Sequence, residues 1–295
     1  MRYYIDQSIY SDAASFEYLF LDFPKDINFI RSCMQNLFLH YADLDLFCAS
    51  VKKERYSELN NRYLYNILKE ILFKNSNALI IPRSPDHRIM GICRDSSLLL
   101  CSILRFFSVP ARLRSGYVTY FIPGLFLDGL VVEYYDCALK RWRLVDTRTS
   151  QEQIDHYHLK IDFDLTDIPE NKFISAAKAW QLCRKGAADP NRFGSRQCRG
   201  LSVVRNRLIQ DLALLNKEEL LVWDVWGGML EPMQNHISLM DDLAKILSID
   251  ENNLSRVRHF YESNPLLKVP DKIFEDSPFF EGVWVDLCEK NNALS

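Results

Sequence analysis

The sequence predicts an α+β fold, and three observations lead to this prediction. Apolar residues recur at helical spacing in the first 73 residues, and a strongly apolar helical pattern covers 92–107. The spacing changes to alternation just after Pro110, and beyond about residue 171 the strand signal nearly disappears. Because helical and strand segments are separated along the chain, the order is typical of α+β proteins.

The N-terminal segments are mainly helical in pattern. Apolar positions at helical spacing occur over 26–47 and over 57–73. The stretch "NALIIPRSPDHRIMG" is predicted to be a loop, because Pro82 and Pro85 prevent a helix. A buried helix over 92–107 follows this loop.

A small antiparallel sheet is expected next, packed on the buried helix, with strands at 111–121, 130–135 and 141–146. The later helices are expected at 171–184, 202–216, 236–248 and 252–262. No Pro- or Gly-rich linker separates the halves. We therefore expect N-terminal helices plus the core over 1–165, and a helical C-terminal extension packed on that core over 166–295.

Composition excludes several classes of function. With 295 residues, a net charge of −3 and 48% hydrophobic residues, the chain resembles an ordinary globular protein. It has no electrostatic reason to bind nucleic acid or an anionic membrane. "MRYYIDQS" lacks the features of a signal peptide. The eight cysteines show neither CxxC nor metal-ligand spacing, so we expect reduced thiols and no metal or cofactor. Reduced thiols and the missing signal peptide predict a cytoplasmic location, or export without a cleaved N-terminal signal.

Cys93, in "GICRDSS", is the candidate nucleophile. It lies at the expected start of the buried helix, after Gly91, where the chain can turn tightly. Unpaired N–H groups and the positive end of the helix dipole lower the pKa of a thiol at this position. Asp146 ends the last strand of the same sheet, where it could orient a catalytic imidazole.

These segments resemble the transglutaminase-like superfamily. "GICRDSSLLLCSILRFFSVPARLRSGYVTYF" is similar to its nucleophile segment, and "DGLVVEYYDCALKRWRLVD" is similar to its next two strands. "DIPENKFISAAKAWQLCRKGAADPNRFG" and "DLALLNKEELLVWDVWG" resemble a bacterial subgroup of transglutaminase-like proteins. The resemblance covers about residues 80–230. It implies a papain-like α+β fold, a Cys-His-Asp triad, and acyl transfer or amide hydrolysis through a thioester.

The chain departs from the family pattern at the catalytic histidine. Cys93 takes the place of the nucleophile and Asp146 that of the orienting acid, but the histidine falls on Gly129. Residues 88–155 contain no histidine. Without an imidazole the site loses both a proton acceptor for the thiol and a proton donor for the departing amine. General acid–base catalysis is typically worth about 10²–10⁴ in rate.

The loss of the imidazole predicts an unactivated site. A carboxylate near a thiolate raises the thiol pKa, so we expect a neutral Cys93 thiol beside a poorly paired Asp146. This expectation changes if a neighbouring arginine supplies a cation, the candidates being Arg94, Arg112 and Arg114. Because a glycine has no side chain, an imidazole-sized hole is expected between Cys93 and Asp146.

The remaining histidines are weaker candidates. His87 lies on the loop before Cys93, and His156 and His158 follow Asp146 as a possible weak metal pair that we attribute to chance. His40, His236 and His259 fall in segments predicted to be helical, and we interpret them as surface or boundary residues.

Two further motifs stand out in the second half. Trp223 and Trp226, in "WDVWGG", could line a ligand groove, but core anchors are the more common role of such aromatics. The loop 184–200 carries arginines among glycines and could bind an acidic group, although a solvated loop is the default.

Three hypotheses for function follow. In the first, the chain is an enzyme that uses Cys93, with its base supplied by a loop histidine, the substrate or a partner. In the second, it is an inactive pseudoenzyme that binds a peptide or protein. In the third, Cys93 acts on an acyl group with a better leaving group than an amine, such as a thioester. The partner is therefore a peptide, a protein, or a small amide or thioester; the oligomeric state is unknown.

Overall fold

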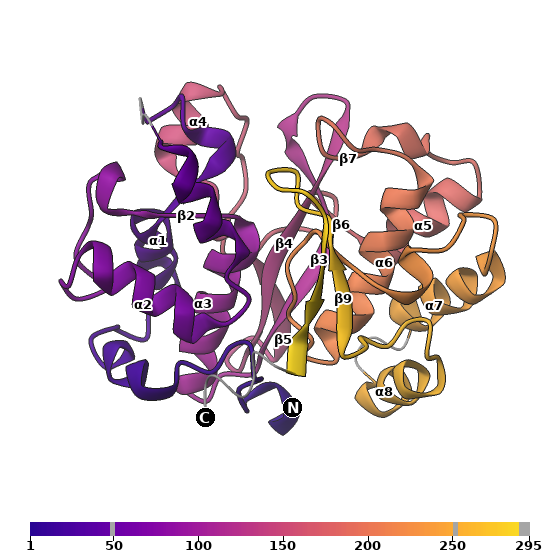
Figure 1. Ribbon diagram of the computed structural model, residues 1–295, viewed down its shortest axis with the longest axis horizontal. Helices are drawn as coiled ribbons and strands as arrows, with labels where there is room; N and C mark the ends of the chain where they lie inside the picture. Colours follow the sequence, from indigo (N-terminus) through magenta and orange to yellow (C-terminus); the bar gives the residue numbers. More distant parts are fainter. Residues whose placement is uncertain (48–50, 250–252, 289–295) are drawn as a thin grey trace. The chain divides into compact units, whose positions relative to one another are not determined.

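The structure is a computed structural model that describes residues 1–47, 51–249 and 253–288. Its contacts divide the chain into two compact units (Figure 1). Unit 1 comprises 1–114 and 129–172, and unit 2 comprises 115–128 and 173–295. Strands β3 (Ala111–Ile122) and β4 (Leu125–Asp136) each pass from one unit into the other. The boundary expected between 165 and 166 stays a prediction, and so does the packing of the extension on the core.

Unit 1 contains the N-terminal helices. Helix α1 begins where the Asp26 carboxylate accepts hydrogen bonds from the N–H groups of Asn28 (2.9 Å) and Phe29 (3.4 Å). In the next helix Leu64, Ile67, Leu68 and Ile71 share one buried face. The helices of unit 1 are α1 (Ile27–Leu37), α2 (Leu64–Lys74), α3 (Cys93–Phe106) and α4 (Gln151–His156).

Helix α3 forms the centre of unit 1, where it packs against α1 and α2. Every residue from Arg94 to Arg105 is buried, so the helix has no solvent-facing stripe. Its charged first turn is internally paired: Asp95 accepts a hydrogen bond from the Ile92 N–H (2.9 Å) and one from Arg94 (3.1 Å). Burial nonetheless raises the pKa of Asp95.

The strands of unit 1 lie on both sides of α3 in the sequence. Strand β1 (Phe38–His40) pairs in parallel with β2 (Ile89–Gly91). The second half of β4 pairs antiparallel with β5 (Arg141–Val145), with Val132 opposite Val145. Helix α3 contacts β4 through the Ser97 hydroxyl, which donates to the Leu130 carbonyl at 3.4 Å.

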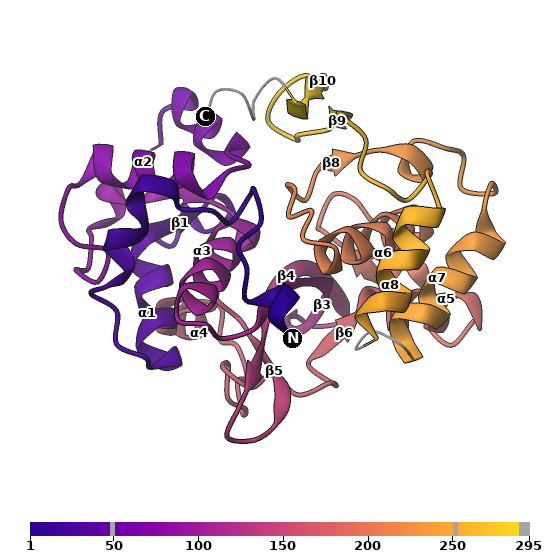
Figure 2. The same cartoon turned by 90° about the horizontal axis from the view of Figure 1, so that it is seen from below.

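Unit 2 is mainly helical, with short strands. Helix α5 packs against both α6 and α7, and Figure 2 shows α5 to α8 gathered in this unit. Trp180 and Trp226 are buried, and the Trp226 Nε1–H donates to the Leu267 carbonyl at 3.1 Å. The helices are α5 (Ala176–Arg184), α6 (Leu201–Leu215), α7 (Ile237–Ile249) and α8 (Leu254–Ser263). The strands are β6 (Phe173–Ser175), β7 (Phe193–Gly194), β8 (Asp224–Val225), β9 (Lys272–Glu275) and β10 (Val283–Asp286).

The predicted α+β class is confirmed, and so are the buried helix and the small antiparallel sheet that follows it. Two predictions about elements were wrong. The helical pattern over 26–47 ends at Leu37, where the chain enters β1 and brings His40 into a strand. The strand signal beyond residue 171 was missed, because strands of two to four residues contain too few positions to show a period.

Candidate active site

Cys93 is the first residue of α3 and is half-buried. Strand β2 ends at Gly91, so only Ile92 lies between the strand and the helix. The Cys93 thiol is therefore located at the N-terminus of α3. The Leu130 N–H of β4 points at the sulfur, with its nitrogen 3.4 Å from Cys93 Sγ. A thiolate at this position would face the positive end of the α3 dipole and one strand N–H group.

Gly129 precedes the residue that contacts the sulfur. A Cβ added there would meet no atom within 4 Å, and its backbone is outside the left-handed region. The strand therefore has room for a side chain at the position where the transglutaminase-like pattern has a histidine. Whether that space forms an imidazole-sized hole between Cys93 and Asp146 stays a prediction.

Asp146 lies directly after β5, and its carboxylate caps its own turn. Oδ1 accepts hydrogen bonds from the N–H groups of Arg148 (2.6 Å) and Thr149 (3.0 Å), and Oδ2 accepts one from the Thr149 hydroxyl. The neighbouring Thr147 hydroxyl lies 2.7 Å from that of Ser96, in the first turn of α3. The turn after β5 is thus joined to the start of the Cys93 helix, and the Asp146 carboxylate is well hydrogen-bonded rather than poorly paired.

The three arginines proposed from the sequence as cations for Cys93 have other partners. Arg94 donates to the Asp95 carboxylate (3.1 Å) and to the Asn61 carbonyl (3.0 Å). Arg112 and Arg114, buried on β3, both bond Glu133, at 2.5 and 3.2 Å. These contacts hold the three side chains in the interior of unit 1, and none of the three is among the residues that line the pocket of Cys93.

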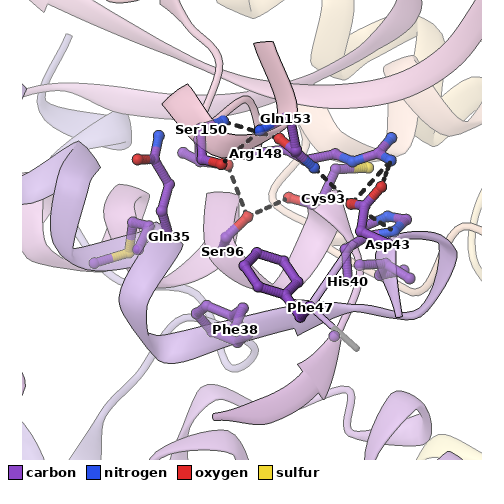
Figure 3. Close-up of a pocket in the computed structure, with 14 residues that line it drawn as sticks. Gln35, Phe38, His40, Asp43, Phe47, Cys93, Ser96, Arg148, Ser150 and Gln153 are labelled. Atoms are coloured by element: carbon purple, nitrogen blue, oxygen red, sulfur yellow. Dashed lines mark hydrogen bonds and ion pairs between the residues drawn. The ribbon is translucent and has the colours of Figure 1, made fainter. Parts of the chain in front are cut away.

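Arg148 supplies a positive charge in this pocket. Its Nη2 lies 3.2 Å from both carboxylate oxygens of Asp43, and Figure 3 shows both side chains with Cys93 on one side of a pocket. Burial alone would lower the pKa of Arg148, but the Asp43 and Asp146 carboxylates, together with Cys93 when its sulfur is charged, raise it above its ordinary value. The guanidinium is therefore close enough to interact electrostatically with a thiolate at Cys93.

Asp43 holds Arg148 in place from a buried position. Its carboxylate also accepts hydrogen bonds from Gln153 Nε2 (2.5 Å) and from the Tyr157 hydroxyl (3.0 Å). Burial acts to raise the pKa of Asp43, but Arg148 leads a group of partners that lowers it overall. Asp43 is therefore a fixed anion, which orients the guanidinium and offsets part of its charge.

His40 lines the same pocket, which the sequence did not predict. It reaches this place because β1 runs parallel to β2 and His40 pairs with Gly91, two residues before Cys93. Its Nδ1 accepts the Ala42 N–H at 3.2 Å. Burial and the nearby Arg148 lower its pKa to about 3, so the imidazole is neutral at pH 7.

The Ala42 hydrogen bond assigns the tautomer of His40. Because Nδ1 accepts it, the proton of the neutral ring sits on Nε2. In this state Nε2–H can donate a hydrogen bond, but it cannot take a proton from a thiol. His40 is therefore present in the pocket without being prepared to act as the missing general base.

The pocket itself is narrow and partly open, with a cavity volume of about 30 Å³. Its walls combine apolar and polar side chains from α1, β1, α3 and the turn after β5 (Figure 3). The lining residues are Met34, Gln35, Phe38, His40, Asp43, Phe47, Gly91, Ile92, Cys93, Ser96, Thr147, Arg148, Ser150 and Gln153.

The other sequence candidates lie outside this pocket. His87 is exposed, with Nδ1 3.1 Å from the Ser84 hydroxyl. His156 and His158 are exposed at the end of α4 and beyond it, so they do not share a strand face. Within 1–47, 51–249 and 253–288 no cluster of side chains fits a metal ion. Trp223 and Trp226 are buried core residues of unit 2 rather than groove residues.

The described residues contain no helix that is long and apolar enough to cross a membrane. The seven cysteines in these ranges form no disulfide, and Cys48 lies outside them.

Comparison with known proteins gives little further support. No family model matches the chain, and no curated protein matches it. Among solved structures, one described as "a putative cysteine protease from Cytophaga hutchinsonii" is similar over 60% of this chain, at 15% identity and a TM-score of 0.33. This chain spans 47% of the length of that protein.

Proposed function

We propose that Cys93 is the nucleophile of an acyl-transfer site that acts on activated acyl groups, such as thioesters. The observation that carries the proposal is the position of Cys93 at the start of α3, in one pocket with the Arg148 guanidinium. A cation and a helix N-terminus both favour the thiolate over the thiol. In this arrangement Arg148 takes over the charge-stabilising half of the role of a triad histidine.

The second function of a triad histidine is to donate a proton to the leaving group, and Arg148 does not provide it. This restricts the substrates on which the site can act. An arginine stays protonated in proteins and cannot give a proton to a departing amine. A thioester needs no such proton: the Cys93 thiolate attacks the acyl carbon, the new C–S bond forms, and the old C–S bond breaks to release a thiolate. Amide cleavage should therefore be slow, and exchange with thioesters should be the favoured reaction.

The test uses a small acetyl thioester at pH 7 with the full chain, and the acetyl group is located by peptide mass spectrometry. We expect acetylation of Cys93 faster than of the exposed Cys137, and none at position 93 in Cys93→Ser. In the double variant Asp43→Asn/Arg148→Gln, which removes the cation without leaving a buried carboxylate alone, the Cys93 rate should fall roughly tenfold, or about 1.4 kcal/mol.

A matched control separates charge from general disturbance. Arg141→Gln removes an exposed arginine that is paired with Asp167 and lies outside the pocket, so the Cys93 rate should not change. Acetylation of Cys93 at the Cys137 rate, or an equal rate in the double variant, would refute the proposal.

A second candidate function is a binding module that has lost its chemistry. It is favoured by Asp146, whose carboxylate is occupied by the Arg148 and Thr149 N–H groups and needs no imidazole partner. If Cys93 neither acetylates nor alkylates faster than Cys137, this candidate replaces the first.

A further inference from the structure

Unit 2 contains a second hollow, formed by the turn between β3 and β4 and the segment around β7. Its volume is about 470 Å³. Three arginines and an asparagine line it together with apolar residues of the turn. The lining residues are Ile122, Pro123, Gly124, Leu125, Asn191, Arg192, Arg196 and Arg199.

The turn and the arginine segment are joined by several contacts. Strand β7 pairs in parallel with the start of β4, Phe193 lying opposite Phe126. Arg192 donates from Nε to the Gly124 carbonyl at 2.9 Å, and its guanidinium lies over the Phe126 ring at 4.8 Å. The Arg192 side chain is thus fixed against the turn that also lines the hollow.

The loop that carries the other two arginines is also preorganised. Gly194 has a φ of 134°, and a Cβ there would lie 2.1 Å from the Cys198 carbonyl oxygen, so only glycine fits. The Ser195 N–H donates to the same carbonyl at 2.9 Å, and Ser195 Oγ accepts the Cys198 N–H at 2.9 Å. Arg199 Nε donates back to the Ser195 carbonyl at 2.9 Å. The backbone of the loop closes on itself and presents Arg196 and Arg199 on the hollow.

Among the residues that the structure describes, the positive charge in the hollow has no acidic partner. Across the described ranges, no carboxylate lies within ion-pair distance of Arg192, Arg196 or Arg199. Arg184 and Arg207 of the same unit do have such partners, Asp241 and Asp128. Like charges held together repel, so an anion bound among the three guanidinium groups would relieve this repulsion.

We propose that this hollow binds a small organic phosphate. A phosphate group carries about two negative charges and presents oxygens in several directions, which suits more than one guanidinium, whereas a single carboxylate is matched by one. The hollow is larger than a phosphate, and Ile122, Pro123 and Leu125 provide an apolar wall for the organic part. This site is separate from the thiol pocket and does not depend on it.

The experiment is calorimetric titration of the full chain with phenyl phosphate, inorganic phosphate and benzoate at constant ionic strength. We expect saturable binding of phenyl phosphate, with inorganic phosphate and benzoate each at least tenfold weaker. The double variant Arg196→Gln/Arg199→Gln should lose at least tenfold in affinity for phenyl phosphate. Lys185→Gln, which removes one positive charge outside the hollow, should bind as the wild type does.

Circular dichroism checks that the double variant is folded. If the double variant is not folded, Arg196→Gln alone provides the test, because the Arg196 side chain makes no hydrogen bond in the described part of the chain. The affinity of this single variant for phenyl phosphate should fall about threefold or more. Absence of saturable phenyl phosphate binding, or equal affinity in the variants, would overturn the site. Benzoate binding as tightly as phenyl phosphate would overturn the phosphate assignment, and equal binding of inorganic phosphate would overturn the role of the apolar wall. Tighter binding of a single-stranded oligothymidine would assign the hollow to nucleic acid instead.

Discussion

Replacing Arg148 with glutamine should destabilise the protein, and the loss should depend on pH. The substitution leaves the Asp43 carboxylate buried, with a side chain 2% exposed, and removes the guanidinium that lies 3.2 Å from both of its oxygens. Gln153 and Tyr157 continue to donate hydrogen bonds to it. Breaking a buried ion pair from one side costs roughly 3–5 kcal/mol. Because Arg148 is partly exposed and two donors remain, we expect about 2–4 kcal/mol at pH 7.

The sign of the pH dependence follows from the directions of the pKa shifts. The folded pKa of Asp43 is lowered, so its contribution to stability is present above the unfolded value of about 3.9 and is lost as pH falls through the folded pKa. Without Arg148, burial should raise that pKa instead, so acid would relieve the penalty in the variant.

The titration of His40 also makes the stability loss in Arg148→Gln smaller at low pH. In the wild type its folded pKa of about 3 lies below the unfolded value of about 6.5, so the protein loses stability as pH falls between the two. Removing the Arg148 charge should let the folded ring protonate more easily, which reduces that loss in the variant. The difference between the two proteins should therefore be largest at pH 7 and smaller at pH 4.5.

The assay is urea unfolding at pH 7 and pH 4.5, followed by tryptophan fluorescence and circular dichroism. The double variant Asp43→Asn/Arg148→Gln should recover part of the stability, since no buried charge is left without its partner. Arg141→Gln, at an arginine 50% exposed, should cost no more than about 0.5 kcal/mol. A loss below about 0.5 kcal/mol in Arg148→Gln, or an equal loss at both pH values, would refute the reasoning.

Two other outcomes are expected. Gly129→His should increase the rate of iodoacetamide labelling of Cys93 at pH 6–7 relative to Gly129→Ala. A Cβ at position 129 meets no atom within 4 Å, and the next residue, Leu130, contacts the sulfur, so an imidazole there has room near the thiol. Equal labelling rates in the two variants would show that the new ring does not reach the thiol. Gly194→Ala should lower the thermal unfolding midpoint and reduce the free energy of unfolding by at least about 1 kcal/mol, because the φ of 134° and the Cys198 carbonyl leave no room for a Cβ. An unchanged midpoint would contradict this steric reasoning.

The sequence by itself determined the elements that local patterns encode. The apolar helix that begins at Cys93 and the change of period after Pro110 were both predicted, because each depends on neighbours a few residues apart. The placement of Cys93 at a helix start follows from the same local pattern. So does the absence of a histidine at Gly129, which can be read directly from the chain.

Only the tertiary structure decided what surrounds the thiol. His40 and Asp43 precede Cys93 by about fifty residues, and Arg148 follows it by a similar separation. They meet because β1 pairs in parallel with β2 and because the turn after β5 is hydrogen-bonded to α3, and neither contact leaves a local period in the sequence. The charge partner of Cys93 is thus set by long-range pairing, which the sequence near Cys93 does not encode.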